Sequence, residues 1–189
     1  MKCILDRKTG ATQPWHALQL AAYTLLDTPV EFKEEGHVYT FEKKHLPSVT
    51  GILKSEGFID DRWFDDYSRN RGSMVHLACH LDDINDLDEG SLDPAIAPYL
   101  TAWRLFKKES GFIVEISEQP RMSTTYQFAG TPDCIGYSPE SNLTRGSVEL
   151  HNNGTYKLVP FKDRNDIKIW LSILACYFWK QNNLKGGKR

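Results

Sequence analysis

The chain has 189 residues, of which 40% are hydrophobic and 25% are charged, and its formal net charge at pH 7 is -2. These values are typical of a soluble globular protein with one sizeable core, and they exclude a strongly basic field over the whole surface. The longest apolar stretches are far too short to span a bilayer, which excludes a membrane-spanning protein. We expect a single domain over residues 1–189, with a flexible tail at 183–189.

Four cysteines are widely scattered along the chain, at Cys3, Cys79, Cys134 and Cys176. They form no C-x-x-C pair, which argues against a structural zinc or iron–sulfur site. Isolated cysteines fit a reducing compartment, so we expect a cytoplasmic protein.

The first half of the chain predicts helices around one short strand and one hairpin. Pro14 suits the first turn of a helix, and Ser48 or Thr50 can cap a later one. In chain order we expect a strand at 2–8, a helix at 14–26, a hairpin with strands at 37–41 and 46–50, a short helix over 51–57, a helix at 61–84 with a break near Gly72, a solvated acidic loop at 82–90 and a helix at 94–110.

Strands are more frequent in the second half. We expect strands at 112–122 and 126–138, a turn region at 139–146, a hairpin at 146–161 and an amphipathic helix at 163–182. Asn153 and Gly154 supply the tight turn of that hairpin. The whole order predicts a mixed α/β or α+β fold, in which helices flank a small central sheet.

Two acidic residues lie inside apolar strand patterns, Asp6 in ILDRK and Asp133 in FAGTPDCIG. A carboxylate among core residues is costly unless it is paired, protonated or bound to a metal. Lys8 is two residues from Asp6, so both side chains point to the same side of a strand. If the two strands are neighbours, these groups form an oxygen-rich site that suits Mg²⁺ or Mn²⁺. The alternatives are a surface ion pair for Asp6 and Lys8, and a turn position for Asp133.

Several motifs together make the sequence similar to a known family. They are T-P-D at 131–133, D-R-K at 6–8, Q-L-A-A-Y at 19–23, R-G-S-M-V-H at 71–76, an acid at Glu118 and the segment LPSVTGIL at 46–53. On these motifs the chain resembles the PD-(D/E)XK nuclease superfamily, and within it the RecB-like and phage-exonuclease branch.

The order of the motifs departs from that family. There, the D-x-K strand directly follows the T-P-D strand and the Q-x-x-x-Y helix comes next, whereas here both come first. Moving residues 2–26 back between Tyr137 and Ser138 restores the family order, so we interpret the chain as circularly permuted. Strand 2–8 must then insert centrally beside strand 128–136. It does so either in its own chain or in a neighbouring molecule, which would give a strand-swapped dimer.

The resemblance implies a restriction-endonuclease-like core and a Mg²⁺- or Mn²⁺-dependent deoxyribonuclease with one or two ions. The expected substrate is DNA at its ends or in single strands, cut by an exonuclease in phage or bacterial recombination or repair. By resemblance, the metal ligands are Asp133, Asp6, the backbone carbonyl of Arg7, His76 and Glu118. Lys8 then orients or activates the attacking water, and Gln19 with Tyr23 positions a phosphate or Lys8.

Other interpretations of the same residues stay open. His76 and His80 are spaced i, i+4 as in some zinc sites, although no third soft ligand is near in sequence. His76 can also be a satisfied helix histidine, and Glu118 a solvated strand end. Gln19 and Tyr23 can simply pack. A catalytically inactive DNA-binding or interaction module on the same scaffold is the alternative function. Candidates for contacting DNA are Trp15, Trp63 and Tyr126 by stacking and Arg69, Arg71 and Arg121 through phosphates.

Overall fold

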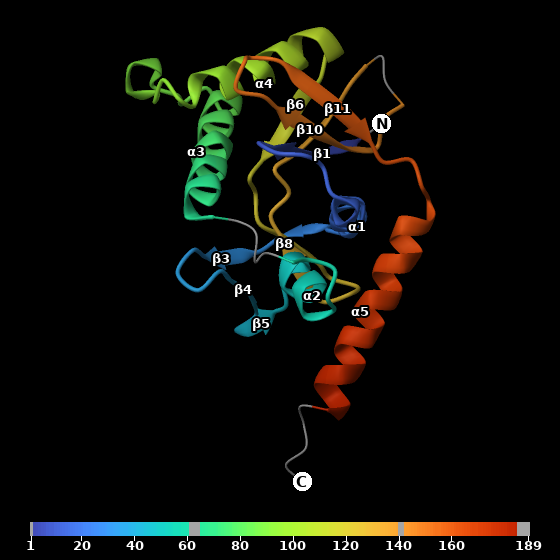
Figure 1. Cartoon of the computed structure of the whole chain (residues 1–189). Helices are drawn as coiled ribbons and strands as arrows, with labels where there is room; N and C mark the ends of the chain where they lie inside the picture. Colours follow the sequence, from blue (N-terminus) through green and yellow to red (C-terminus); the bar gives the residue numbers. More distant parts are fainter. Residues whose placement is uncertain (1, 61–64, 140–141, 185–189) are drawn as a thin grey trace. The chain divides into compact units, whose positions relative to one another are not determined.

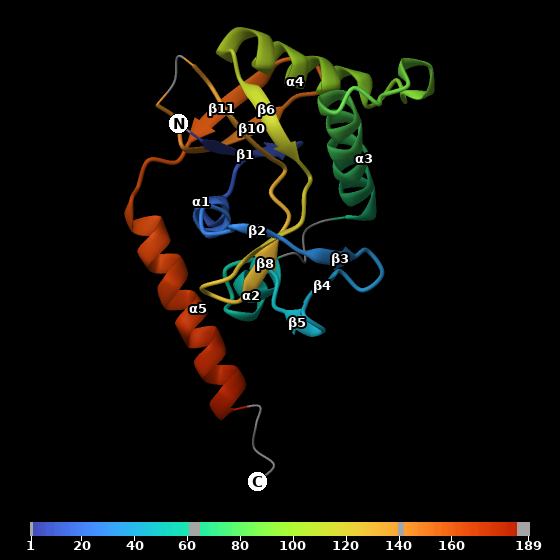
Figure 2. The same cartoon turned by 180° about the vertical axis from the view of Figure 1, so that it is seen from behind.

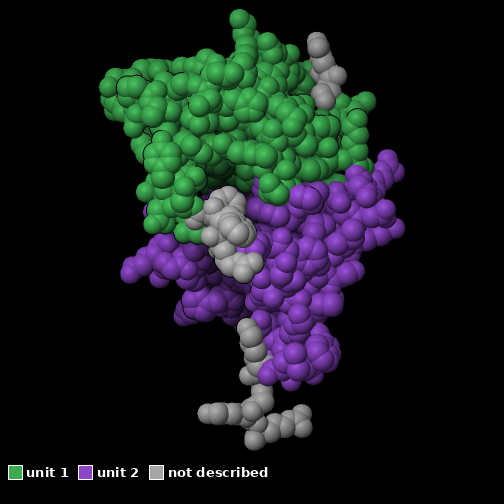
Figure 3. Space-filling view, viewed as in Figure 1, with its two compact units in different colours: residues 1–13, 62–119, 132–162 green, residues 14–61, 120–131, 163–189 purple. Residues whose placement is uncertain are grey.

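A computed structural model describes residues 2–60, 65–139 and 142–184 of the chain (Figure 1). It confirms the predicted mixed α/β class, because helices accompany a mixed sheet and two antiparallel ones. Internal contacts divide the chain into two compact units, shown in green and purple in Figure 3. Unit 1 comprises Met1–Gln13, Arg62–Gln119 and Pro132–Lys162, and unit 2 comprises Pro14–Asp61, Pro120–Thr131 and Asp163–Arg189. Within the described residues, no helix is long and apolar enough to cross a membrane.

Unit 1 is built on a five-stranded mixed sheet with the strand order β11-β10-β1-β9-β6. Its strands are β1 (Cys3–Lys8), β6 (Ile113–Ser117), β9 (Cys134–Tyr137), β10 (Arg145–Leu150) and β11 (Tyr156–Pro160). The first strand of the chain is therefore the central one. It pairs in parallel with β10 and antiparallel with β9, with Leu5 opposite Cys134. The predicted central insertion of strand 2–8 is confirmed, and it occurs here within one chain.

Two helices of unit 1, α3 (Asp66–Asp83) and α4 (Ala97–Ser110), pack against this sheet, and a short 3-10 helix, η1 (Glu89–Ser91), lies between them in sequence. In both views α4 runs along the sheet (Figures 1 and 2). Cys3 and Leu5 alternate along β1 toward these helices and join their apolar core, together with Trp103 of α4. Because side chains alternate along a strand, Arg7 points to this same side.

Asp65 caps the N-terminus of helix α3. The side chain of Asp65 accepts a 2.6 Å hydrogen bond from the backbone N–H of Ser68, which satisfies one of the first orphan donors. The helix then runs without interruption through Gly72, so the predicted break there is wrong. Residues 61–64, the predicted start of this helix, lie outside the described residues.

The described residues of unit 2 form three helices and two small antiparallel sheets. The helices are α1 (Pro14–Tyr23), α2 (Val49–Ser55) and α5 (Asn165–Asn183). One sheet has the order β2 (Thr28–Pro29), β7 (Arg121–Ser123), β8 (Phe128–Gly130), and the other β3 (Glu31–Lys33), β4 (Val38–Phe41), β5 (Lys44–Leu46). Trp170 of α5 is fully buried and stacks edge-on against Phe128 of β8.

The two long strands predicted at 112–122 and 126–138 are each wrong as single elements. The first divides into β6 and β7, and the second into β8 and β9, and the halves belong to different sheets. Glu118 has a positive φ of 49° and Pro120 lacks an N–H, so the first strand cannot continue. Pro132 has the same effect at the second break. These breaks put Glu118 and Asp133 just outside their strands.

The predicted hairpin at 37–50 is shifted. Glu42 and Lys43 have positive φ values of 48° and 64°, which is the geometry of a two-residue hairpin turn, so the return strand is already complete at Leu46. Ser48 then caps α2 by accepting a 3.0 Å hydrogen bond from the backbone N–H of Gly51. The capping prediction for Ser48 is confirmed, and the strand predicted at 46–50 is wrong beyond Leu46.

Candidate metal centre

The end of β1, the end of β6 and the start of β9 meet at one edge of the central sheet. This edge is formed by strand ends and not by an outer strand. Both β1 and β6 run antiparallel to β9, so the ends of β1 and β6 lie beside the start of β9. Lys8 closes β1, Glu118 follows β6, and Asp133 precedes β9. Strand pairing and direction therefore bring Lys8 beside two acids that lie much further along the chain.

Helix α3 adds a histidine to this edge. His76 Nδ1 lies 3.1 Å from Glu118 Oε1 and 3.6 Å from Asp133 Oδ2. The ligand atoms of these three residues lie within 4.8 Å of one another, the one such group of three that the described residues contain. Burial alone would lower the pKa of His76, but the charges of Asp133 and Glu118 outweigh it and raise the pKa above its ordinary value.

Asp6 and Lys8 form an ion pair of 2.9 Å between Oδ1 and Nζ. Asp6 is 1% exposed and its other oxygen accepts a 3.3 Å hydrogen bond from Ser147 Oγ, so the interpretation as a surface ion pair is wrong. Burial alone would lower the pKa of Lys8, but Asp6 and Asp133 outweigh it and raise the pKa. The ammonium of Lys8 thus lies in the field of both carboxylates.

Asp133 is fixed through the backbone of β1. Its Oδ2 accepts a 2.6 Å hydrogen bond from the backbone N–H of Arg7, and its carbonyl oxygen accepts one of 3.0 Å from the N–H of Glu118. Arg7 thus enters the site through its N–H and its side chain, and its carbonyl as a metal ligand stays a prediction. Asp133 therefore occupies a bend between Pro132 and β9, as the turn alternative expected, and its partners on β1 and beside β6 hold it there.

These residues are the candidates for holding a divalent cation. Asp133 and Glu118 offer carboxylate oxygens and His76 offers an imidazole nitrogen, a donor set that suits Mn²⁺ and, through its oxygens, Mg²⁺. Asp6 is not part of this group of three, and its oxygens bind Lys8 and Ser147. Its role as a direct ligand stays a prediction, and its observed contact is with the lysine.

Gln19 and Tyr23 belong to α1 in unit 2. Gln19 Nε2 donates a 2.9 Å hydrogen bond to Tyr23 Oη, and both side chains are buried. The bond confirms that the two residues share one face of the helix. Their action on a phosphate or on Lys8 stays a prediction.

The sequence interpretation missed a buried charge network behind the site. The run 82–90 was expected to be a solvated loop, which is wrong for its first two residues. Asp82 and Asp83 end α3, and the side chain of Asp83 is 0% exposed and pairs with Arg7 and Lys107. The helical spacing could have revealed this, because Asp83 continues the buried i, i+4 series of Val75 and Cys79.

The arginines expected to contact DNA have contacts within the chain. The guanidinium of Arg71 lies 5.6 Å from the ring centre of Tyr67, and Arg121 donates a 2.8 Å hydrogen bond to the carbonyl of Asp27. Arg69 pairs with Asp66 on the exposed side of α3, and Trp63 lies outside the described residues. Their contacts to DNA stay predictions.

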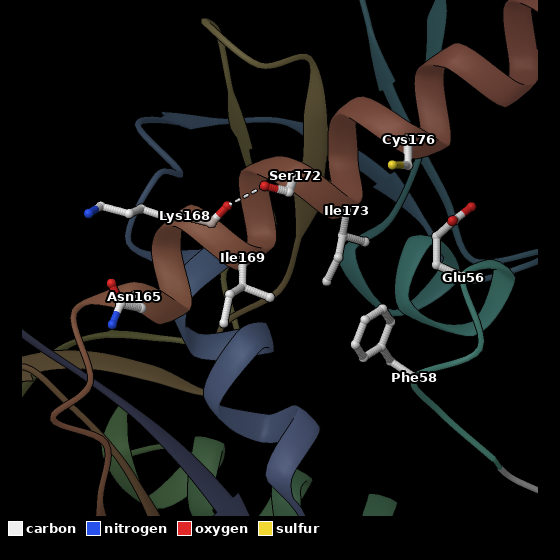
Figure 4. A pocket seen from close by; sticks show the side chains of 8 residues that line it. All are labelled: Glu56, Phe58, Asn165, Lys168, Ile169, Ser172, Ile173 and Cys176. Carbon is white, nitrogen blue, oxygen red and sulfur yellow. Dashed lines mark hydrogen bonds between the residues drawn. The ribbon is translucent and has the colours of Figure 1, made fainter.

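A hollow of about 480 Å³ in unit 2 has different chemistry. It lies along α5, from which Ile169 and Ile173 point into it. Phe58, on the segment that follows α2, lines its other side (Figure 4). The one carboxylate on its wall, Glu56, binds Lys180 at 2.7 Å. Within the described residues, the group of three possible metal ligands lies elsewhere, at His76, Glu118 and Asp133.

Comparison with known proteins assigns the chain to no family. No protein-family model matches the chain, and no curated protein matches it at a significant level. The cluster at the edge of the central sheet is therefore the basis for any functional assignment.

Proposed function

We propose that this chain is a Mg²⁺- or Mn²⁺-dependent deoxyribonuclease that hydrolyses phosphodiester bonds, acting as an exonuclease on DNA ends or single strands. One observation carries the proposal: His76, Glu118 and Asp133 place ligand atoms within 4.8 Å of one another. The D-R-K strand lies directly beside the strand that follows T-P-D, as the family's order of motifs requires. The placement of β1 supports the resemblance despite the permuted sequence.

In this proposal Asp133, Glu118 and His76 hold the cation. A bound divalent ion supplies neutralisation of the anionic phosphodiester, activation of a water and stabilisation of the leaving oxygen. The residues themselves are pre-arranged for the task, because Asp133 is held by the β1 backbone and Glu118 by a 2.9 Å ion pair with Arg7.

Lys8 is the proposed catalytic cation of the chain itself. Its ammonium has three donors and its side chain is 22% exposed, while Asp6 anchors it from the buried side. With a raised pKa it is positively charged at neutral pH. It therefore orients the attacking water or stabilises charge developing on a phosphate oxygen, rather than accepting a proton.

Labelled single-stranded and duplex DNA with Mg²⁺ or Mn²⁺ tests the proposal. We expect cleavage by the wild-type chain, and its loss in Asp133→Ala and in Lys8→Ala. Matched controls are Asp66→Ala, whose side chain is 94% exposed, and Lys157→Ala, 63% exposed; both should cleave like the wild type. Cleavage that survives both site substitutions would refute the assignment. Duplexes with blocked ends separate end-directed from internal cutting.

A catalytically inactive DNA-binding module is the second candidate. It is favoured by the chain's own cations, since Glu118 already contacts Arg7 and His76, and Asp6 contacts Lys8. Such a module would bind DNA without cutting it, and Asp133→Ala would not change that binding. Calorimetric Mn²⁺ binding to the folded protein distinguishes the two, because the nuclease requires it.

The biological setting follows from the resemblance alone. We propose a role in phage or bacterial DNA recombination or repair, in the cytoplasm, with DNA as the partner. Nuclease assays with the matching RNA would decide the preference between the two nucleic acids.

A further inference from the structure

The side chain of Arg7 is 0% exposed, although arginine is among the residues least often buried. One guanidinium nitrogen, Nη2, donates 2.9 Å hydrogen bonds to Glu118 Oε1 and to the carbonyl oxygen of Asp133. The backbone N–H of the same residue binds Asp133 Oδ2. One residue therefore contacts both acids of the candidate metal centre.

The guanidinium is itself held from behind. Its other terminal nitrogen, Nη1, donates a 2.9 Å hydrogen bond to Asp83 Oδ2. Asp83 is fixed in turn by Trp103 Nε1 at 2.8 Å and by Lys107 Nζ at 2.7 Å. The ring of Trp103 also lies 5.2 Å from the guanidinium carbon of Arg7. The anchor thus belongs to α3 and α4, the helices of the unit 1 core.

We propose that Arg7 is a positioning residue, which fixes Asp133 and Glu118 in the geometry for binding a divalent cation. This inference rests on the proposed function and extends it. Glutamate has several rotatable bonds, so a free side chain would lose conformational freedom on binding the cation. A carboxylate ordered in advance avoids that cost, and outer partners of metal ligands act in this way.

The chemistry of arginine fits this role. Its planar guanidinium presents several donors in fixed directions, and here it reaches Asp83, Glu118 and the Asp133 carbonyl at once. Lysine has the same charge but concentrates its donors at one atom. It cannot bridge acceptors on three separate segments of the chain in the same arrangement.

Removing Arg7 alone would have opposing effects. The loss of a positive charge beside Glu118 favours cation binding, whereas the loss of orientation weakens it. Asp83 would also remain buried without this partner, which strongly destabilises a fold. The double variant Arg7→Met/Asp83→Asn removes one charge of each sign, so no carboxylate is left buried at position 83 without its arginine partner. Arg7→Lys keeps a positive charge in this region and so tests the loss of orientation.

The experiment measures Mn²⁺ binding to folded, DNA-free protein by calorimetry, with urea unfolding of the same samples. We expect Arg7→Met/Asp83→Asn to bind Mn²⁺ about 10- to 100-fold more weakly than the wild type. Arg7→Lys keeps the charge and is the second variant, for use if the double variant does not fold. It should bind Mn²⁺ about 10-fold more weakly than the wild type. Arg69→Met is the control, because Arg69 pairs with Asp66 on the exposed side of α3; it should bind like the wild type.

The outcomes separate this inference from the proposed function. If the wild type binds Mn²⁺ and cleaves DNA but the folded variants bind Mn²⁺ within about twofold of it, Arg7 does not position the ligands and the nuclease proposal stands. If the wild type neither binds Mn²⁺ nor cleaves DNA, both proposals fall. A purely structural role for Arg7 predicts a lower urea midpoint and an unchanged Mn²⁺ affinity of the folded protein. A weaker Mn²⁺ affinity of the folded variants would therefore rule out a purely structural role.

Discussion

The backbone N–H of Arg7 donates a 2.6 Å hydrogen bond to Oδ2 of Asp133, a residue 126 positions further along the chain. The bond is possible because β1 is the central strand of the unit 1 sheet and lies antiparallel to β9. A strand at the start of the chain thus completes a site whose acids are encoded far downstream.

The close approach of β6 and β9 gives a first prediction. A Cβ at Gly136 would lie 2.0 Å from the carbonyl oxygen of Ile113, so Gly136→Ala must push these strands apart. We expect it to lower the free energy of unfolding by about 3 kcal/mol, measured by urea titration. Mn²⁺ binding should weaken as well, because Glu118 and Asp133 sit at the ends of these two strands.

Gly10→Ala is the matched control, since no heavy atom lies within 4 Å of a Cβ there. It should change the free energy of unfolding by no more than about 0.5 kcal/mol. Equal stability of the two variants would contradict the tight β6–β9 pairing.

The end of α3 gives a prediction about pH. Burial would raise the pKa of Asp82, but hydrogen bonds from Arg104 and Lys107 outweigh it and hold the pKa below 3.8. The stabilisation from these bonds is therefore fully present above pH 3.8 and is lost as the pH falls through the lower folded-state value.

Asp82→Asn should thus reduce the free energy of unfolding at pH 6 by roughly 1 kcal/mol, and this difference from the wild type should shrink below pH 3.8. Urea midpoints recorded from pH 6 to pH 2 measure it. A gap of constant size across that range would show that the carboxylate is not held by its two cations.

The site lies within one chain, which predicts how inactive variants behave in mixtures. Lys8→Ala and Asp133→Ala chains, unfolded together and refolded, should regain no nuclease activity. In a strand-swapped dimer, β1 of one chain would join Asp133 of the other and restore one intact site per mixed pair. Recovered activity in the mixture would therefore demonstrate exchange of β1, and light scattering would show the dimer.

Much of the local structure could be predicted from sequence patterns. The apolar run of β1, the Asn153-Gly154 turn and the Ser48 cap depend on neighbouring residues, and all three are observed. The strand breaks after Ser117 and before Cys134 were missed, although Pro120 and Pro132 mark both of them in the sequence. The positive φ of Glu118 adds to the first break and could not be read from the sequence.

The candidate site likewise has one part that the sequence predicts and one part that it does not. Asp133, Glu118, His76 and the pair of Asp6 and Lys8 were expected from motifs, and the structure brings them to one sheet edge. The side-chain role of Arg7 was not foreseeable from its neighbours. It depends on Asp83 and Glu118, 76 and 111 positions away, and such partners become visible only when the strands are paired.

The most direct test of the central claim is the anomalous diffraction of Mn²⁺ soaked into crystals of the wild-type protein. We predict a Mn²⁺ peak within bonding distance of His76, Glu118 and Asp133, and no such peak in Asp133→Ala crystals. Well-ordered crystals that show Mn²⁺ only elsewhere, or none at saturating concentration, would contradict the assignment of this cluster as a metal centre.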